Sequence, residues 1–72
     1  MKVYITFGQT YVHSCGSKVL DKDCLAAIEC ENKESGRAKA FELFDGVFHH
    51  CYEKNDLTDE LLSFYPRGII DV

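Results

Sequence analysis

The chain has 72 residues, of which 46% are hydrophobic and 28% are charged, and its formal net charge is −4. This length predicts one small domain, residues 1–72, near the lower limit at which a hydrophobic core supports itself without staples. The composition argues against a disordered chain. The acidic balance argues against direct nucleic-acid binding, because a phosphate backbone attracts positive surfaces. No run of about 18 apolar residues exists that could span a membrane.

The N-terminal stretch alternates between apolar and more polar side chains over residues 3–8. This period of two predicts a strand with one buried face. We expect an exposed arm to follow, in which Cys15-Gly16-Ser17 forms a tight turn and residues 18–20 return. The stretch lacks the charge and apolar length of a signal peptide, so a cytosolic location with free cysteines is expected.

A second strand is predicted at residues 24–31, again from alternation. One face carries small and apolar side chains: Cys24, Ala26, Ile28 and Cys30. The other face carries Leu25, Ala27, Glu29 and Glu31. The small side chains of the first face favour close packing of the helix that follows.

The main helix is predicted at about residues 33–45. Asn32 is a suitable N-cap because its side-chain oxygen can accept from an amide of the first turn. Gly46 is a suitable stop because glycine enters the left-handed conformation without steric cost. At about 100° per residue, the apolar stripe expected to face the sheet consists of Ala40, Phe41 and Phe44.

Three further elements complete the predicted fold. A third strand is expected at 47–52, and Thr58 caps a short helix over about 58–64, ahead of a final strand at 69–72. The order predicts an α+β fold: a sheet of about four mostly antiparallel strands with the main helix on one face.

The second face of this sheet has no helix assigned to it. It would carry Tyr4, Thr6, Leu25 and Ala27. An uncovered face of this kind predicts homodimerisation or partner binding.

Several stretches together carry a resemblance to a known group of proteins. They are Val3 to Gln9, Asp21 to Cys24, Gly36 to Phe44 and Phe64 to Gly68. Through them the whole chain resembles small uncharacterised proteins encoded by bacteriophages and prophages. The resemblance implies an accessory protein in the cytoplasm of a host bacterium that blocks a host protein by direct binding, as anti-CRISPR proteins do. It assigns no catalytic or binding residue.

The candidate binding residues are aromatic and arginine side chains, because these types dominate binding hot spots. They are Tyr65, Arg67, Arg37, Tyr4 and Tyr11. No catalysis is expected: Cys51 has His50 beside it, but neighbouring strand residues point to opposite faces.

Acidic residues gather around the second helix at Asp56, Asp59 and Glu60. One interpretation is a surface that imitates phosphates for a DNA-binding host protein, and the other is a solvated face that also caps the helix. The modest net charge favours the second interpretation. It also mildly favours a partner with a basic or nucleic-acid-binding surface.

The alternative function is a small metal-binding or regulatory module. Two pairs, His13/Cys15 and His49/Cys51, each place a nitrogen and a sulfur ligand two residues apart. Brought together, they would give the four ligands that tetrahedral zinc requires. The spacing is not that of a known zinc motif, so neither a metal nor another cofactor is expected.

Overall fold

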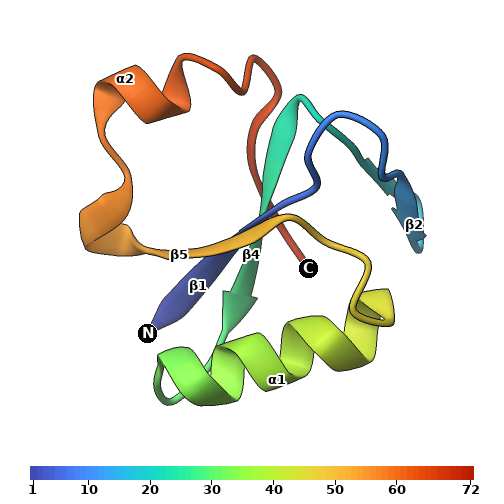
Figure 1. The fold of residues 1–72 in the computed structure, drawn as a ribbon, viewed down its shortest axis with the longest axis vertical. Coiled ribbons are helices and arrows are strands. Elements are labelled where there is room, and N and C mark those ends of the chain that lie inside the picture. The colour runs from blue at the N-terminus through green and yellow to red at the C-terminus, as the bar shows by residue number, and fades with distance from the viewer.

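The computed structural model describes residues 1–72 and confirms the α+β fold. A four-stranded sheet carries α1 on one face and α2 on the other, with a small hairpin beside it (Figure 1). The elements are β1 (Lys2–Thr6), β2 (His13–Cys15), β3 (Lys18–Leu20), β4 (Cys24–Glu29), α1 (Lys33–Phe44), β5 (His50–Glu53), the 3-10 turn η1 (Lys54–Asp56), α2 (Asp59–Leu62) and β6 (Gly68–Asp71). Neither α-helix has the length and apolar character needed to cross a lipid bilayer.

The sheet has the strand order β5-β1-β4-β6. β1 is antiparallel to both of its neighbours, while β6 runs parallel to β4, so the sheet is mixed and mostly antiparallel. The register places Ile5 opposite Ala26 on one side and Cys51 on the other. The predicted turn at Gly16 joins β2 and β3 into a separate hairpin.

The ends of α1 follow the predicted chemistry. The Ser35 amide donates to the Asn32 side chain at 2.8 Å, and the Asn32 amide donates to the Ser35 hydroxyl at 3.1 Å, which forms a capping box. At the other end, Asp45 and Gly46 adopt left-handed conformations with φ of 53° and 73°. The helix therefore starts and stops at the residues that the sequence indicates.

The buried stripe of α1 differs from the predicted one. It consists of Gly36, Ala40 and Phe44, whereas Phe41 is 48% exposed. The reason is the glycine: a Cβ at position 36 would lie 2.6 Å from Cγ2 of Val3, so the missing side chain lets the helix approach β1 closely. Because of this close contact, Gly36, Ala40 and Phe44 face the sheet, and Phe41 faces outward.

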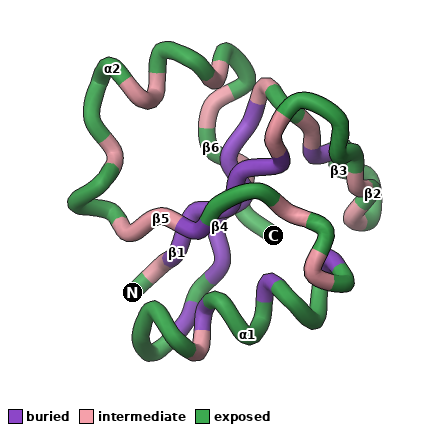
Figure 2. The backbone as a smooth tube through the Cα atoms, in the orientation of Figure 1, coloured by how far each residue is buried: buried purple, intermediate pink, exposed green.

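The main core lies between α1 and the sheet, where the backbone of β1 and β4 is buried (Figure 2). It joins residues from β1, β4, α1, β5 and the hairpin: Val3, Ile5, Phe7, Leu20, Cys24, Ala26, Ile28, Cys30, Ala40, Phe44 and Cys51. The rings of Phe7 and Phe44 meet edge to face at 5.1 Å between centroids. All four cysteines are free.

The second face of the sheet is covered, and the prediction of an open face is wrong. Tyr4, Leu25 and Ala27 form a second buried cluster. The covering side chains are Tyr52, Leu57, Leu62 and Tyr65. Most of them come from the segment around α2, in which Thr58 caps the helix by accepting from the Leu61 amide. The homodimer was predicted from an uncovered face, and this face is covered by the chain itself.

Thr6 lies on this second face and is the one residue with a buried side-chain hydroxyl that makes no hydrogen bond. The Tyr65 phenol lies close to Thr6, and burial raises the pKa of Tyr65. Thr6→Val keeps the shape and removes the orphaned group, so it is expected to raise the free energy of unfolding by about 1–2 kcal/mol in urea titrations. Thr6→Ser, which keeps the hydroxyl and loses the methyl group, is expected to lower it. A loss of stability in the valine variant would contradict this prediction.

Candidate binding cleft

A cleft of about 390 Å³ opens where the chain leaves β1, enters β5 and leaves α2. We call it the Phe64 cleft; it is lined by Gly8, Gln9, Lys22, His49, Phe64 and Tyr65. Its volume falls in the range of about 300–1,000 Å³ that is typical of binding sites for small molecules. The lining combines two aromatic rings with an amide, an amine and an imidazole.

Phe64 is the most unusual side chain of the cleft, because it is 66% exposed although it is large and apolar. Its neighbour Tyr65 packs against the second buried cluster, so one aromatic ring is anchored and the next is presented to solvent. The break after α2 creates this arrangement, since the chain turns at Pro66 instead of continuing the helix.

An ion pair ties the segment that follows α2 to the segment before β4, which carries the cleft residue Lys22. Arg67 contacts Asp21 at 3.1 Å between Nη1 and Oδ1, and the Arg67 amide donates to the Asp23 carbonyl at 2.9 Å. The Asp23 amide, which donates to Asp21 at 3.0 Å, and the Arg67 guanidinium hold the pKa of Asp21 below its usual range. Because the pKa of Asp21 is lowered, its carboxylate is charged at neutral pH, and the ion pair with Arg67 is lost only when the pH falls below the range in which an ordinary aspartate titrates.

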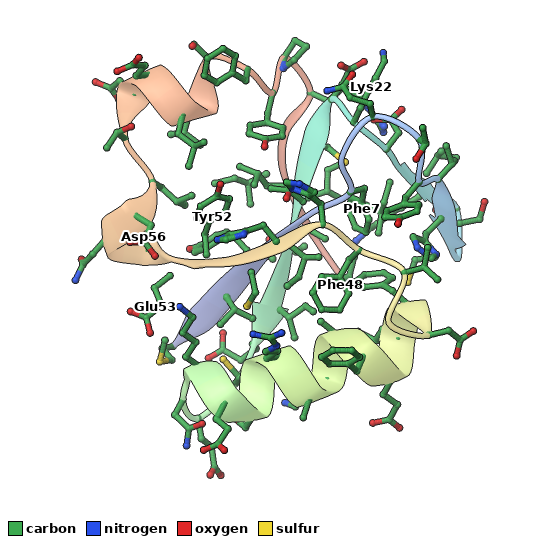
Figure 3. All side chains as sticks on the ribbon, in the orientation of Figure 1. Phe7, Lys22, Phe48, Tyr52, Glu53 and Asp56 are labelled. Atoms are coloured by element: carbon green, nitrogen blue, oxygen red, sulfur yellow. The ribbon has the colours of Figure 1, made fainter.

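On the other side of β5, α1 presents basic and aromatic side chains. The Arg37 guanidinium lies over the Phe41 ring at 5.6 Å from its centroid, and Phe41 meets Phe48 edge to face at 5.1 Å. Figure 3 shows Phe48 between β5 and α1, with Tyr52 on the opposite side of β5. Arg37 is thus held in place by an aromatic contact.

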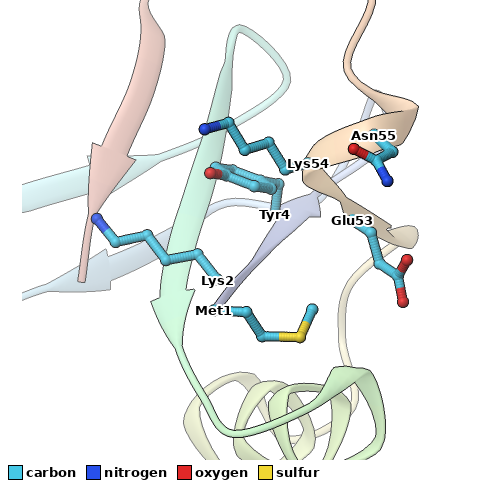
Figure 4. Close-up of a pocket in the computed structure, with 6 residues that line it drawn as sticks. All are labelled: Met1, Lys2, Tyr4, Glu53, Lys54 and Asn55. Atoms are coloured by element: carbon cyan, nitrogen blue, oxygen red, sulfur yellow. The ribbon is translucent and has the colours of Figure 1, made fainter.

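A wider cleft of about 460 Å³ lies at the start of β1 (Figure 4). Its charged side chains have mixed signs, Lys2, Glu53 and Lys54, and Lys2 is already paired with Asp71 at 2.8 Å. The cleft contains no exposed aromatic ring. Its chemistry therefore favours a binding function less than that of the Phe64 cleft.

The predicted binding residues lie in separate places. Tyr65 lines the Phe64 cleft, and Arg67 lies two residues further on, paired with Asp21 outside the lining. Tyr4 is buried at 8% exposure and borders the wider cleft, Tyr11 is exposed in the loop before the hairpin, and Arg37 lies on α1. Only one of the five therefore lines the Phe64 cleft.

Four residues of the cleft were not singled out as site residues from the sequence: Gly8, Gln9, Lys22 and Phe64. His49 was singled out only as a candidate metal ligand, paired with Cys51. One signal was present, because three of the stretches that carry the resemblance supply residues to this cleft. Gln9, Lys22 and Phe64 come from these stretches. Only His49 comes from elsewhere, and no pattern in the sequence connects it with the others.

The two His/Cys pairs do not form a ligand set. The His13 ring packs against Phe7 and Phe44, and its Nε2 lies 2.6 Å from the Val47 carbonyl oxygen. Cys51 is buried under α1, where burial raises the pKa of its thiol. No group of three or more His, Cys, Asp or Glu side chains converges in a way that could hold a metal ion.

The His50 ring lies against the Tyr52 ring, with 4.3 Å between centroids and a tilt of 43°.

Comparison of the chain with protein-family models, curated proteins and solved structures finds no match.

Proposed function

We propose that this chain is a phage-encoded accessory protein that acts in the host cytoplasm. It binds a host protein and inhibits that protein by covering part of its surface, without catalysis. An anti-defence role, such as that of anti-CRISPR proteins, is the expected context. The observation that carries the proposal is the exposed Phe64 ring at the rim of a cleft that can receive a side chain in return.

Exposed aromatic residues on a rigid support are typical anchors of protein interfaces. Here Phe64 follows Ser63, the C-cap of α2, and its neighbour Tyr65 is fixed on the sheet. The partner would cover the Phe64 ring and insert a side chain between Gln9, Lys22 and His49. Water would be excluded from the ring, which supplies the affinity.

The charge next to this anchor supports a partner with a basic surface. Asp59 and Glu60 are exposed in the first turn of α2, and Glu60 precedes Phe64 by four residues. Carboxylates at the rim of an interface steer an oppositely charged partner and speed its association. We therefore expect the complex to weaken as the salt concentration rises.

The experiment starts with tagged protein and a lysate of the host bacterium, followed by purification of the captured protein. Binding is then measured with the two pure components. Phe64→Ala is expected to weaken the complex at least about tenfold, because an interface anchor contributes about 2 kcal/mol or more. The same variant should release the partner's activity from inhibition.

The matched control is Phe41→Ala, which removes another half-exposed phenylalanine that does not line the cleft. It should bind like the wild type. Thermal melts of both variants show whether the chain is still folded. Equal affinity of the Phe64→Ala variant and the wild type would reject the proposed interface, and a bound partner whose activity is unchanged would reject inhibition.

A further inference from the structure

A small hollow of about 140 Å³ separates α1 from the start of β5. We call it the Lys33–Arg37 hollow; its lining is Lys33, Arg37, Phe48, His49, His50 and Cys51. Unlike the Phe64 cleft and the wider cleft at the start of β1, this hollow is lined by two cationic side chains and no carboxylate. This concentration of positive charge stands out on a chain whose net charge is −4.

The two cations are available for a ligand. The ion pairs of the molecule involve Lys2, Lys22, Arg67 and the N-terminal amine, so Lys33 and Arg37 have no carboxylate partner. They occupy positions i and i+4 of α1 and therefore project from the same side of the helix. Both cations lower the pKa of the Cys51 thiol, although burial raises it by more. The electric fields of Lys33 and Arg37 therefore act together at Cys51, which lines the hollow.

Arg37 is also positioned in advance. Its guanidinium lies against Phe41, and Phe41 in turn packs on Phe48, which itself lines the hollow. An arginine held in this way loses less side-chain entropy when it binds a ligand. The guanidinium offers several donors in a fork that suits phosphate oxygens, and the Lys33 amine adds a mobile point charge.

Size restricts the ligand to a single small group. Its volume of about 140 Å³ is much smaller than that of the Phe64 cleft, which is about 390 Å³. One phosphate group suits a space of this size better than a whole nucleoside does. A longer phosphodiester chain would also meet the repulsion of the acidic surface.

We propose that the Lys33–Arg37 hollow binds one tetrahedral oxyanion of the phosphate class, either free or as a phosphate monoester. Lys33 and Arg37 supply the charge, and Phe48 closes one wall. The site rests on these side chains; at the helix N-terminus itself, the Ser35 amide already donates to Asn32. The inference is independent of the proposed host partner, because it concerns the isolated chain and a different hollow.

The test is a titration of the isotope-labelled chain with inorganic phosphate at constant ionic strength, followed by NMR. Saturable shifts are expected at the amides of residues 48–51, with one binding site. Lys33→Gln and Arg37→Gln should each weaken binding about tenfold, which is the loss expected for one charge-assisted hydrogen bond. Lys54→Gln, which removes an exposed lysine outside the hollow, is the matched control and should bind phosphate like the wild type.

Four further ligands make the outcome decisive. Phosphoserine should bind at the same site as phosphate, whereas acetate should bind more weakly. Equal shifts with chloride, or an equal loss in Lys54→Gln, would overturn the proposal as unspecific charge attraction. Much tighter binding of a short single-stranded oligonucleotide would overturn the assignment to a single phosphate group. None of these outcomes depends on whether a host partner exists.

Discussion

Replacing Phe44 with alanine is expected to unfold a large part of the population at 25 °C. The Phe44 ring is 2% exposed and fills the space between α1 and the sheet, where it contacts the rings of Phe7 and His13. Truncation of a buried phenylalanine costs about 3–5 kcal/mol, through lost burial and through the cavity that remains. Small domains lie near the low end of the usual range of about 5–15 kcal/mol in total stability, so little stability would be left.

Phe41→Ala is the control for this substitution, because it removes the same side chain from the same helix. With Phe41 48% exposed, the expected loss is about 1 kcal/mol or less. Both variants are compared with the wild type by thermal melts and urea titration. A decrease of less than about 1 kcal/mol in the free energy of unfolding of Phe44→Ala, or equal decreases in both variants, would contradict an orientation of α1 in which Phe44 is buried and Phe41 is exposed.

Gly36→Ala is expected to destabilise the protein by about 1–3 kcal/mol through overpacking. In an ordinary helix the same substitution stabilises by about 1 kcal/mol, so the sign of the change is itself the test. The added Cβ would lie 2.6 Å from Cγ2 of Val3 and 2.8 Å from Sγ of Cys30. Val3 is fully buried and Cys30 nearly so, and neither can move away freely.

A double-mutant cycle with Val3→Ala isolates this contact. Val3→Ala alone leaves a cavity, and an alanine at position 36 would partly fill it. The two losses should therefore add up to at least about 1 kcal/mol more than the loss in the double variant. Additive losses, or a gain of stability in Gly36→Ala alone, would show that the helix does not need the close approach.

The elements with a strong local signal could be predicted from the sequence. Alternation identified β1 and β4, and capping chemistry at Asn32 and Gly46 placed the ends of α1 within a residue. These signals depend on neighbours in the chain, so no tertiary information was needed. The third predicted strand began too early, because the apolar Val47 and Phe48 belong to the connection that packs on α1.

Two features could not be predicted because they depend on contacts between distant residues. The face that α1 turns to the sheet is determined by the close contact of Gly36 with Val3. Periodicity alone assigned Phe41, with its large apolar side chain, to the buried face in place of a glycine. The cover of the second sheet face comes from Leu57, Leu62 and Tyr65, whose spacing matches neither a strand nor a long helix. A segment without a regular period gives no sign of the face that it buries.

The candidate sites show the same limit. Tyr65 and Arg67 were identified from residue type, and the structure places Tyr65 in the cleft, while Arg67 pairs with Asp21 outside its lining. The residues that complete the cleft include Gln9, which follows β1, and His49, which precedes β5, and the fold of the sheet brings them together. The charge of the whole chain also concealed the Lys33–Arg37 hollow, since a local cluster of two cations does not change an acidic total.

The position of β1 in the sheet has a consequence for the order of folding. β1 is the first strand along the sequence, yet it lies in the interior of the sheet, with Val3 paired to Ile28 on one side and to Glu53 on the other. During synthesis the backbone hydrogen-bonding groups along both edges of β1 stay unpaired until β4 and β5 have left the ribosome, and closing each loop costs chain entropy. Such long-range pairing slows folding. The interval before β5 emerges is therefore the period in which the nascent chain is most exposed to misassembly.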